Sequence, residues 1–155
     1  MGPRLDYSTA APEAMRAMLA LEKYNHASGL EASLLELVKM RASQINGCAY
    51  CLDMHSKDAR AAGEAEQRLY VLPAWREAPF YSERERAALA WCEALTLLPS
   101  HDQSVPDGLY KEASAQFDEK ELVDLTLLVG SINVWNRINI AARPEVGEYK
   151  PGMFG

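Results

Sequence analysis

Two cysteines and a histidine lie close together in the sequence, at a spacing that suits one face of a helix. Cys48 and Cys51 form a CxxC pair, and His55 follows the second cysteine by four residues. Gly63 is the residue type expected just past a helix end. Because a helix has about 3.6 residues per turn, residues four apart are neighbours on its surface. The spacing therefore predicts a helix over 48–62 whose first two turns present both sulfurs and the imidazole on one face, as in a redox site.

These side chains can carry out thiol chemistry. A helix N-terminus lowers the pKa of a cysteine, and this effect alone favours Cys48 as the more acidic thiol. His55, however, lies one turn from Cys51 and can take its proton, which favours Cys51 as the nucleophile. A thiolate that attacks the O–O bond of a hydroperoxide becomes a sulfenic acid, and a second cysteine within reach condenses with it to a disulfide. A dithiol donor then restores both thiols by exchange. The residues alone leave open which of the two sulfurs attacks.

Other kinds of site use similar residues. The CxxC pair and His55 could bind zinc with Glu36 or His101 as the fourth ligand, although structural zinc sites usually contain a second CxxC or histidine pair, which this sequence lacks. Leu52, rather than a histidine, follows the pair, which argues against haem attachment. Three cysteines are too few for a four-thiolate iron–sulfur cluster. A chance pair of core cysteines is the remaining alternative.

Two more side chains are candidates for the site. Glu36 lies within an apolar stretch, where the pattern alone favours a solvent-exposed position, but a partly buried carboxylate could relay protons to His55. Tyr50 either donates a hydrogen bond near the sulfurs or packs as an aromatic ring. Cys92 is interpreted as a buried helix cysteine that behaves as a small apolar residue. Polar residues of the last helix either bridge neighbouring helices or subunits or line the pocket: Asn133, Asn136, Arg137 and Asn139.

Length, composition and charge limit the class of protein. A chain of 155 residues fits one domain, here 1–155 with a core of about 4–143 and a tail at 144–155. No apolar run approaches the roughly 20 residues that span a bilayer, and we expect no signal peptide. The net charge of −6, without a basic cluster, argues against nucleic acid and anionic membrane as partners. A lone CxxC pair suits a reducing compartment, so we expect a cytoplasmic protein.

The periodicity predicts an all-α fold. Apolar residues recur at steps of three and four, Ser82 and Glu85 form a capping box, and Pro99 and Pro144 end helices. The first dozen residues are expected to be irregular, and the tail is expected to be mobile unless it docks on another subunit. The expected helices cover 13–26, 31–45, 48–62, 64–72, 82–98, a segment from a cap at 104–107 to 117, and 118–142.

The central stretch resembles a known family. The run from Glu36 through Asn46-Gly47 to Cys51, with His55 and Ala59, is similar to the alkylhydroperoxidase D (AhpD)-like proteins of the carboxymuconolactone decarboxylase superfamily. The segments 83–89 and 132–137 also look like later helices of that family, so the resemblance covers roughly 4–143.

The resemblance implies an all-helical fold with the CxxC motif at the N-terminus of a central helix, a homo-oligomer (trimer or hexamer), and a thiol-dependent peroxidase activity in antioxidant defence. By position, Cys51 resembles the peroxidatic cysteine and Cys48 the resolving one. Glu36 and His55 resemble the proton relay. The resemblance implies neither a metal nor an organic cofactor. The implied partners are a hydroperoxide substrate and a dithiol or protein reductant.

One position departs from the family pattern. Peroxidases of the family often carry a histidine next to the second cysteine, where this sequence has Tyr50. Since the reference pKa of tyrosine is about 10, its phenol is a poor base near neutral pH. The decarboxylase branch works without a cysteine pair, which makes its chemistry the lesser alternative. The remaining alternative is a redox sensor or disulfide-exchange protein.

Overall fold

The computed structural model describes residues 2–98 and 105–154, and every regular element within these ranges is a helix. The all-α prediction is therefore confirmed, with the CxxC motif at the start of a central helix. The elements in chain order are α1 (Tyr7–Ala10), α2 (Pro12–Ala27), α3 (Ala32–Asn46), α4 (Ala49–Ala61), α5 (Glu66–Val71), the 3₁₀ turn η1 (Leu72–Ala74), α6 (Glu83–Thr96), α7 (Asp107–Ser114) and α8 (Glu119–Ala142).

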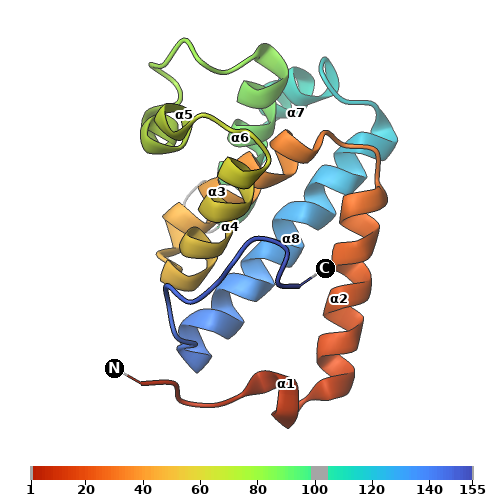
Figure 1. Ribbon diagram of the computed structural model, residues 1–155. Coiled ribbons are helices and arrows are strands. Elements are labelled where there is room, and N and C mark those ends of the chain that lie inside the picture. The colour runs from red at the N-terminus through yellow and green to blue at the C-terminus, as the bar shows by residue number, and fades with distance from the viewer. Residues whose placement is uncertain (1, 99–104, 155) are drawn as a thin grey trace.

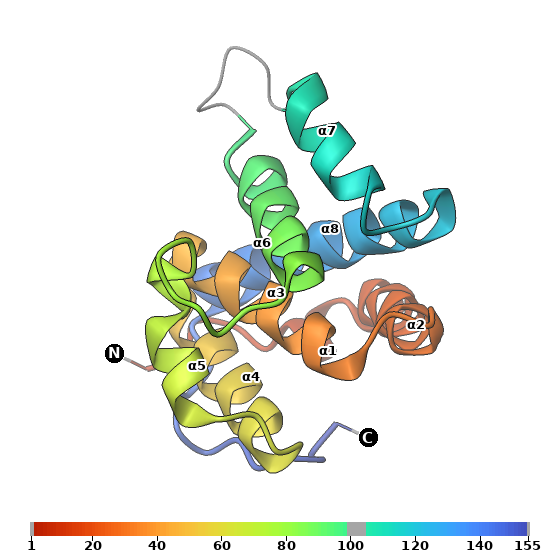
Figure 2. The same ribbon diagram turned by 90° about the horizontal axis from the view of Figure 1, so that it is seen from above.

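Helix α3 is the centre of the fold. It packs against α4, α6 and α8, and the view from above shows it between α6 on one side and α4 on the other (Figure 2). Val38 belongs to a core cluster shared with α6, α7 and α8, whereas Leu37 belongs to a second cluster shared with α4, α5 and η1. Adjacent residues of one helix thus lie in two different cores. This explains why the apolar residues of α3 are spaced so that they cover most of its circumference.

Capping boxes fix where α6 and α8 begin. Ser82 and Glu85 form the predicted capping box at α6, and Asp118 and Glu121 form another at α8. The expected N-terminal irregularity is wrong at one place, because Asp6 accepts hydrogen bonds from the backbone amides of residues 8 and 9 and caps the short α1. Such a short turn has no apolar period that would reveal it. Pro99 and the proposed cap at Ser104 lie outside the described residues.

The C-terminal tail lies against α4 of its own chain. Lys57 donates through Nζ to the carbonyl oxygens of Gly147 and Tyr149 at 2.9 and 3.1 Å, and the Tyr149 hydroxyl donates to Asp58 at 2.8 Å. Figure 1 shows the tail returning from the end of α8 past α4. The expectation of a tail that is mobile or docked on another subunit is therefore corrected: polar side chains of α4 hold it. Among the described helices, none is long and apolar enough to cross a membrane.

The two-cluster core predicts which residues of α8 stabilise the fold. Leu125 is fully buried, whereas Leu127 of the same helix is 39% exposed. Leu125→Ala is expected to lower the free energy of unfolding by about 3 kcal/mol, because it removes buried methyl groups and leaves a cavity. Urea denaturation followed by circular dichroism measures the loss. Leu19→Ala, on α2 at a side chain that is 55% exposed, is the matched control and should cost less than about 1 kcal/mol. Equal losses in both variants would contradict this packing.

Candidate active site

A tight turn joins the two helices that carry the site. Gly47 ends α3 in the left-handed conformation, with φ of 68°, and Cys48 follows as the N-cap of α4. The Cys51 backbone amide donates to the Cys48 sulfur at 3.3 Å, so this sulfur takes the place of the usual capping oxygen. The predicted helix start at Cys48 is thus found in the structure.

The two cysteines are joined in a disulfide. Their Cα atoms are 5.4 Å apart, within the range in which a disulfide bridges two residues without moving the backbone. Both side chains are buried: Cys48 is 1% exposed and Cys51 is 0% exposed. The pair can therefore exist as a disulfide within one turn of α4, which is what a reversible dithiol site requires.

Glu36 and His55 meet across the interface of α3 and α4. Glu36 Oε2 lies 3.0 Å from His55 Nδ1, and the two side chains are 15% and 8% exposed. Burial raises the pKa of Glu36, but the hydrogen bond and charge of His55, together with the charges of Lys39 and His26, outweigh burial and lower it overall. The carboxylate is therefore ionised at neutral pH. The prediction that Glu36 can act beside His55 agrees with this geometry, whereas an exposed position on a polar strip does not.

A buried lysine lies on the other side of the carboxylate. Lys39, 3% exposed at its side chain, places Nζ 3.8 Å from Glu36 Oε1 and 3.3 Å from Glu22 of α2. It also lies 3.4 Å from Nε2 of His26, which is exposed. One oxygen of Glu36 thus faces the imidazole and the other faces an ammonium group. Sequence reasoning did not select Lys39, because lysine is rarely buried unless it is paired.

The asparagines of α8 bridge helices, one of the two roles expected for them. Asn46 donates to the side-chain oxygens of Asn133 and Asn136, at 3.0 and 2.9 Å, and Asn136 donates to Ser43 Oγ at 3.0 Å. These bonds tie the end of α3 to α8. Asn139, one turn further along, donates through Nδ2 to the Cys51 sulfur at 3.4 Å. Asn139 therefore takes the second of the two expected roles, because its side chain lies at the site.

The remaining candidates lie as follows. Tyr50 is partly buried, and burial followed by the charge of Asp53 raises the pKa of its phenol. Within the described part of the chain, its hydroxyl makes no hydrogen bond to either sulfur. Cys92 is fully buried, as expected, and burial raises the pKa of its thiol to about 12. His101 lies outside the described residues, and among those described no group of three or more His, Cys, Asp or Glu side chains could hold a metal ion.

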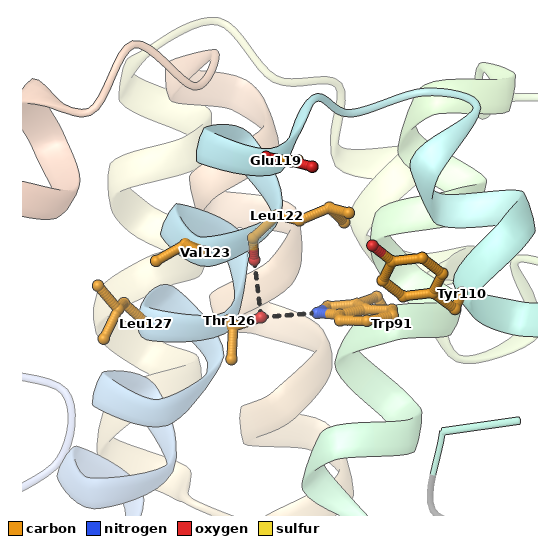
Figure 3. A pocket seen from close by; sticks show the side chains of 7 residues that line it. All are labelled: Trp91, Tyr110, Glu119, Leu122, Val123, Thr126 and Leu127. Carbon is orange, nitrogen blue, oxygen red and sulfur yellow. Dashed lines mark hydrogen bonds between the residues drawn. The ribbon is translucent and has the colours of Figure 1, made fainter. Parts of the chain in front are cut away.

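Two surface pockets differ in their relation to these residues. Glu36 lines a pocket of about 360 Å³, whose other walls include Leu37, Ala59 and Arg68 of α5. The relay therefore opens to solvent at its carboxylate end. The other, of about 380 Å³, lies between α6, α7 and α8 and contains none of the site residues (Figure 3). There, Trp91 Nε1 donates to Thr126 Oγ1 at 3.1 Å.

The Glu36–His55 pair predicts a pH dependence of stability. Because folding lowers the pKa of Glu36 from its ordinary value of 4.5, its contribution is fully present above that pH and is lost as the pH falls through the folded value. Glu36→Gln should lower the free energy of unfolding of the oxidised protein by about 2 kcal/mol at pH 7, since a charged hydrogen bond is lost. Denaturation measured from pH 7 to pH 3 should show the two proteins converging in acid. Glu13→Gln, at a carboxylate whose side chain is 79% exposed, should leave the profile unchanged. Parallel curves for wild type and Glu36→Gln would contradict the pairing.

Comparison with known proteins agrees with the fold and with the motif. A family model described as the carboxymuconolactone decarboxylase family matches residues 12–94. The uncharacterised protein YdfG of Bacillus subtilis (strain 168) is 50% identical over 141 residues, which cover 91% of this chain and 95% of that protein.

Solved structures show the same fold. A protein of unknown function from Agrobacterium tumefaciens, described as a candidate antioxidant defence protein AhpD, superimposes with a TM-score of 0.89 at 42% identity, covering 95% of this chain and 99% of that one. The debrominase Bmp8 superimposes with a TM-score of 0.80 at 23% identity, covering 90% and 74% of the two chains, and shares the fold alone. The length of the family match and the identity to the Bacillus protein show that the chain belongs to the carboxymuconolactone decarboxylase family, as an AhpD-like member.

Proposed function

We propose that this protein is a thiol-dependent peroxidase that reduces hydroperoxides with electrons from a dithiol. The observation that carries the proposal is the juxtaposition of the Cys48–Cys51 disulfide with the Glu36–His55 pair, whose nitrogen and oxygen are 3.0 Å apart. A redox-active pair and a base with an orienting carboxylate are the two components that such a reaction needs. The similarity to a protein of Agrobacterium tumefaciens that is described as a candidate antioxidant defence protein AhpD supports a role of this kind.

The first step takes place at Cys51. His55, one turn further along α4, takes the thiol proton, and Glu36 stabilises the imidazolium that forms. The thiolate attacks one oxygen of the hydroperoxide, an S–O bond forms, and the O–O bond breaks. The leaving alkoxide takes the proton from the imidazolium and departs as an alcohol, or as water if the substrate is hydrogen peroxide. The sulfur, oxidised by two electrons, is now a sulfenic acid.

The second step restores the disulfide seen in the structure. Cys48, as a thiolate, attacks the sulfenic sulfur of Cys51, an S–S bond forms, and the hydroxyl leaves as water after it takes a proton. The N-cap position favours this thiolate, because the Cys51 amide donates to it and the helix N-terminus is partially positive. A dithiol then reduces the disulfide by two exchange steps and is itself oxidised to a disulfide.

An assembly of identical chains is part of this proposal. Apolar side chains on one face of α8 are exposed at steps of four and seven residues: Val123 at 58%, Leu127 at 39% and Val134 at 42%. The first two also line the pocket of Figure 3. Exposed apolar stripes of this kind are typical of surfaces that another protein covers. A trimer or hexamer, as the family resemblance implies, would cover this apolar stripe of α8.

Steady-state peroxide consumption with a dithiol reductant tests the proposed function. The wild type should turn over, Cys51→Ser should lose turnover completely, and His55→Ala should lose about a hundredfold, since general-base assistance is worth about that much. Cys92→Ser is the matched control, because its thiol is buried and remote from the reaction, and it should keep wild-type activity.

Two outcomes would favour other functions. Oxidation of the pair without turnover would favour a redox sensor or a disulfide-exchange protein. Turnover of a lactone acid that survives the Cys48→Ser/Cys51→Ser double substitution would favour the decarboxylase chemistry for which the family is named.

A further inference from the structure

We propose that Asn139 is a catalytic residue that stabilises the Cys51 thiolate, and that Tyr7 is the positioning residue that aims it. Asn139 Nδ2 lies 3.4 Å from the Cys51 sulfur, and the Tyr7 hydroxyl donates to Asn139 Oδ1 at 3.0 Å. The two bonds form a chain from the N-terminal segment through α8 to the reacting sulfur. The proposal rests on the proposed function only in taking Cys51 as the sulfur that reacts.

The position of Asn139 suits a fixed hydrogen-bond donor. Its side chain is in the interior, 4% exposed, and both of its polar atoms have partners. Because no water competes at such a place, an N–H aimed at a developing negative charge is worth more than in solution. In the oxidised protein the acceptor is a disulfide sulfur, which is a weak acceptor. The same sulfur as a thiolate accepts the bond strongly, so the bond favours the reactive form over the neutral thiol.

Tyr7 holds the amide with its donor end toward the sulfur. The phenol donates to Oδ1, which leaves Nδ2 toward Cys51, and a thiolate, which can only accept, requires this orientation. Burial, followed by the charges of Tyr50 and Asp6, raises the pKa of Tyr7, so its hydroxyl keeps the proton it donates. With the amide reversed, an oxygen would face the thiolate and destabilise it.

The N-terminal segment is held where it can do this. The Arg4 backbone amide donates to the Ala142 carbonyl at 2.8 Å, which fastens the segment to the last turn of α8. The Tyr7 ring also packs against Trp135, with centroids 6.4 Å apart. Figure 1 shows the segment crossing below the end of α8. A stretch that the sequence suggested was irregular therefore completes the surroundings of the sulfur.

Other ionisable groups lie on the elements around this thiol, and the test must separate their titrations from the effect of Asn139. They come from α4, α3 and the N-terminal segment: Cys48, Tyr50, Asp53 and His55; Glu36 and Lys39; and Tyr7. Asn139 itself does not titrate, so replacing it with leucine shifts the thiol pKa without adding or removing a titration.

The test is the pH dependence of iodoacetamide alkylation of Cys51 in the reduced Cys48→Ser protein, followed by peptide mass spectrometry. Asn139→Leu removes the donor and should raise the midpoint by about one pH unit, with about a tenfold slower reaction at pH 7. Asn139→Asp places a like charge beside the thiolate and should raise it further. Tyr7→Phe should raise it by a smaller amount, about half a unit, because the amide remains but is no longer aimed.

Tyr24→Phe is the matched control. Tyr24 also donates its hydroxyl to a side chain of α8, that of Asp124 at 2.7 Å, and this bond lies far along the helix from the cysteines. It should leave the midpoint unchanged. If the Asn139 variants fail to fold, as judged by circular dichroism, Tyr7→Phe decides. An unchanged midpoint in Tyr7→Phe, or in a folded Asn139→Leu, would overturn the proposal. Since alkylation needs no hydroperoxide, the shift can be present even if peroxide turnover is absent.

Discussion

The hydrogen bond between Glu36 and His55 depends on how α3 and α4 are joined. With Gly47 in the left-handed conformation and Cys48 already capping the next helix, the chain reverses within two residues. The two helices then run side by side, which brings a residue from the second turn of α3 against one from the second turn of α4. A side chain at position 47 would strain this backbone, because residues other than glycine rarely adopt a φ of 68°. This one turn thus positions the N-cap, the CxxC pair and the Glu36–His55 pair.

Burying a carboxylate in this fold requires charges around it. Lys39 and His55 lie on the two oxygens of Glu36, and Glu22 balances the lysine from α2. Removing one member of such a set leaves a buried charge unpaired, which is more costly than removing the whole set. This gives α2, which contacts α8 and lies away from α4, a direct electrostatic connection to the site. The charge of the relay is therefore set by three helices.

Much of this could be predicted from the sequence, and what was missed has a common cause. The helices of twelve or more residues follow from the spacing of apolar residues and from their caps, with ends within about two residues of those expected. The CxxC pair with His55 follows from helix geometry. Glu36 did not: its neighbours favoured an exposed residue, a carboxylate that relays protons to His55 was the alternative, and the family resemblance favoured that alternative. Its hydrogen bond exists because α4 returns along α3, which is a tertiary contact.

The same limit applies to other residues whose surroundings the sequence left open or did not indicate. Lys39, Asn139, Tyr7 and the tail around Tyr149 are placed by elements that are distant in the sequence. No local pattern distinguishes a buried lysine from an exposed one, or an asparagine that bridges two helices from one that meets a sulfur. The pattern shows which residues form the scaffold, whereas these long-range contacts determine what surrounds Cys51 and Glu36.

The most direct test is to trap the sulfenic acid after one turnover. Reduced Cys48→Ser and Cys51→Ser proteins would each be treated with one equivalent of hydroperoxide in the presence of dimedone, and the adducts located by mass spectrometry. The account predicts an adduct on Cys51 in the Cys48→Ser protein and none in the Cys51→Ser protein, because His55 and Asn139 both serve that sulfur. An adduct on Cys48 in the Cys51→Ser protein, with none on Cys51 in the other, would contradict it and assign the attack to the sulfur at the N-cap.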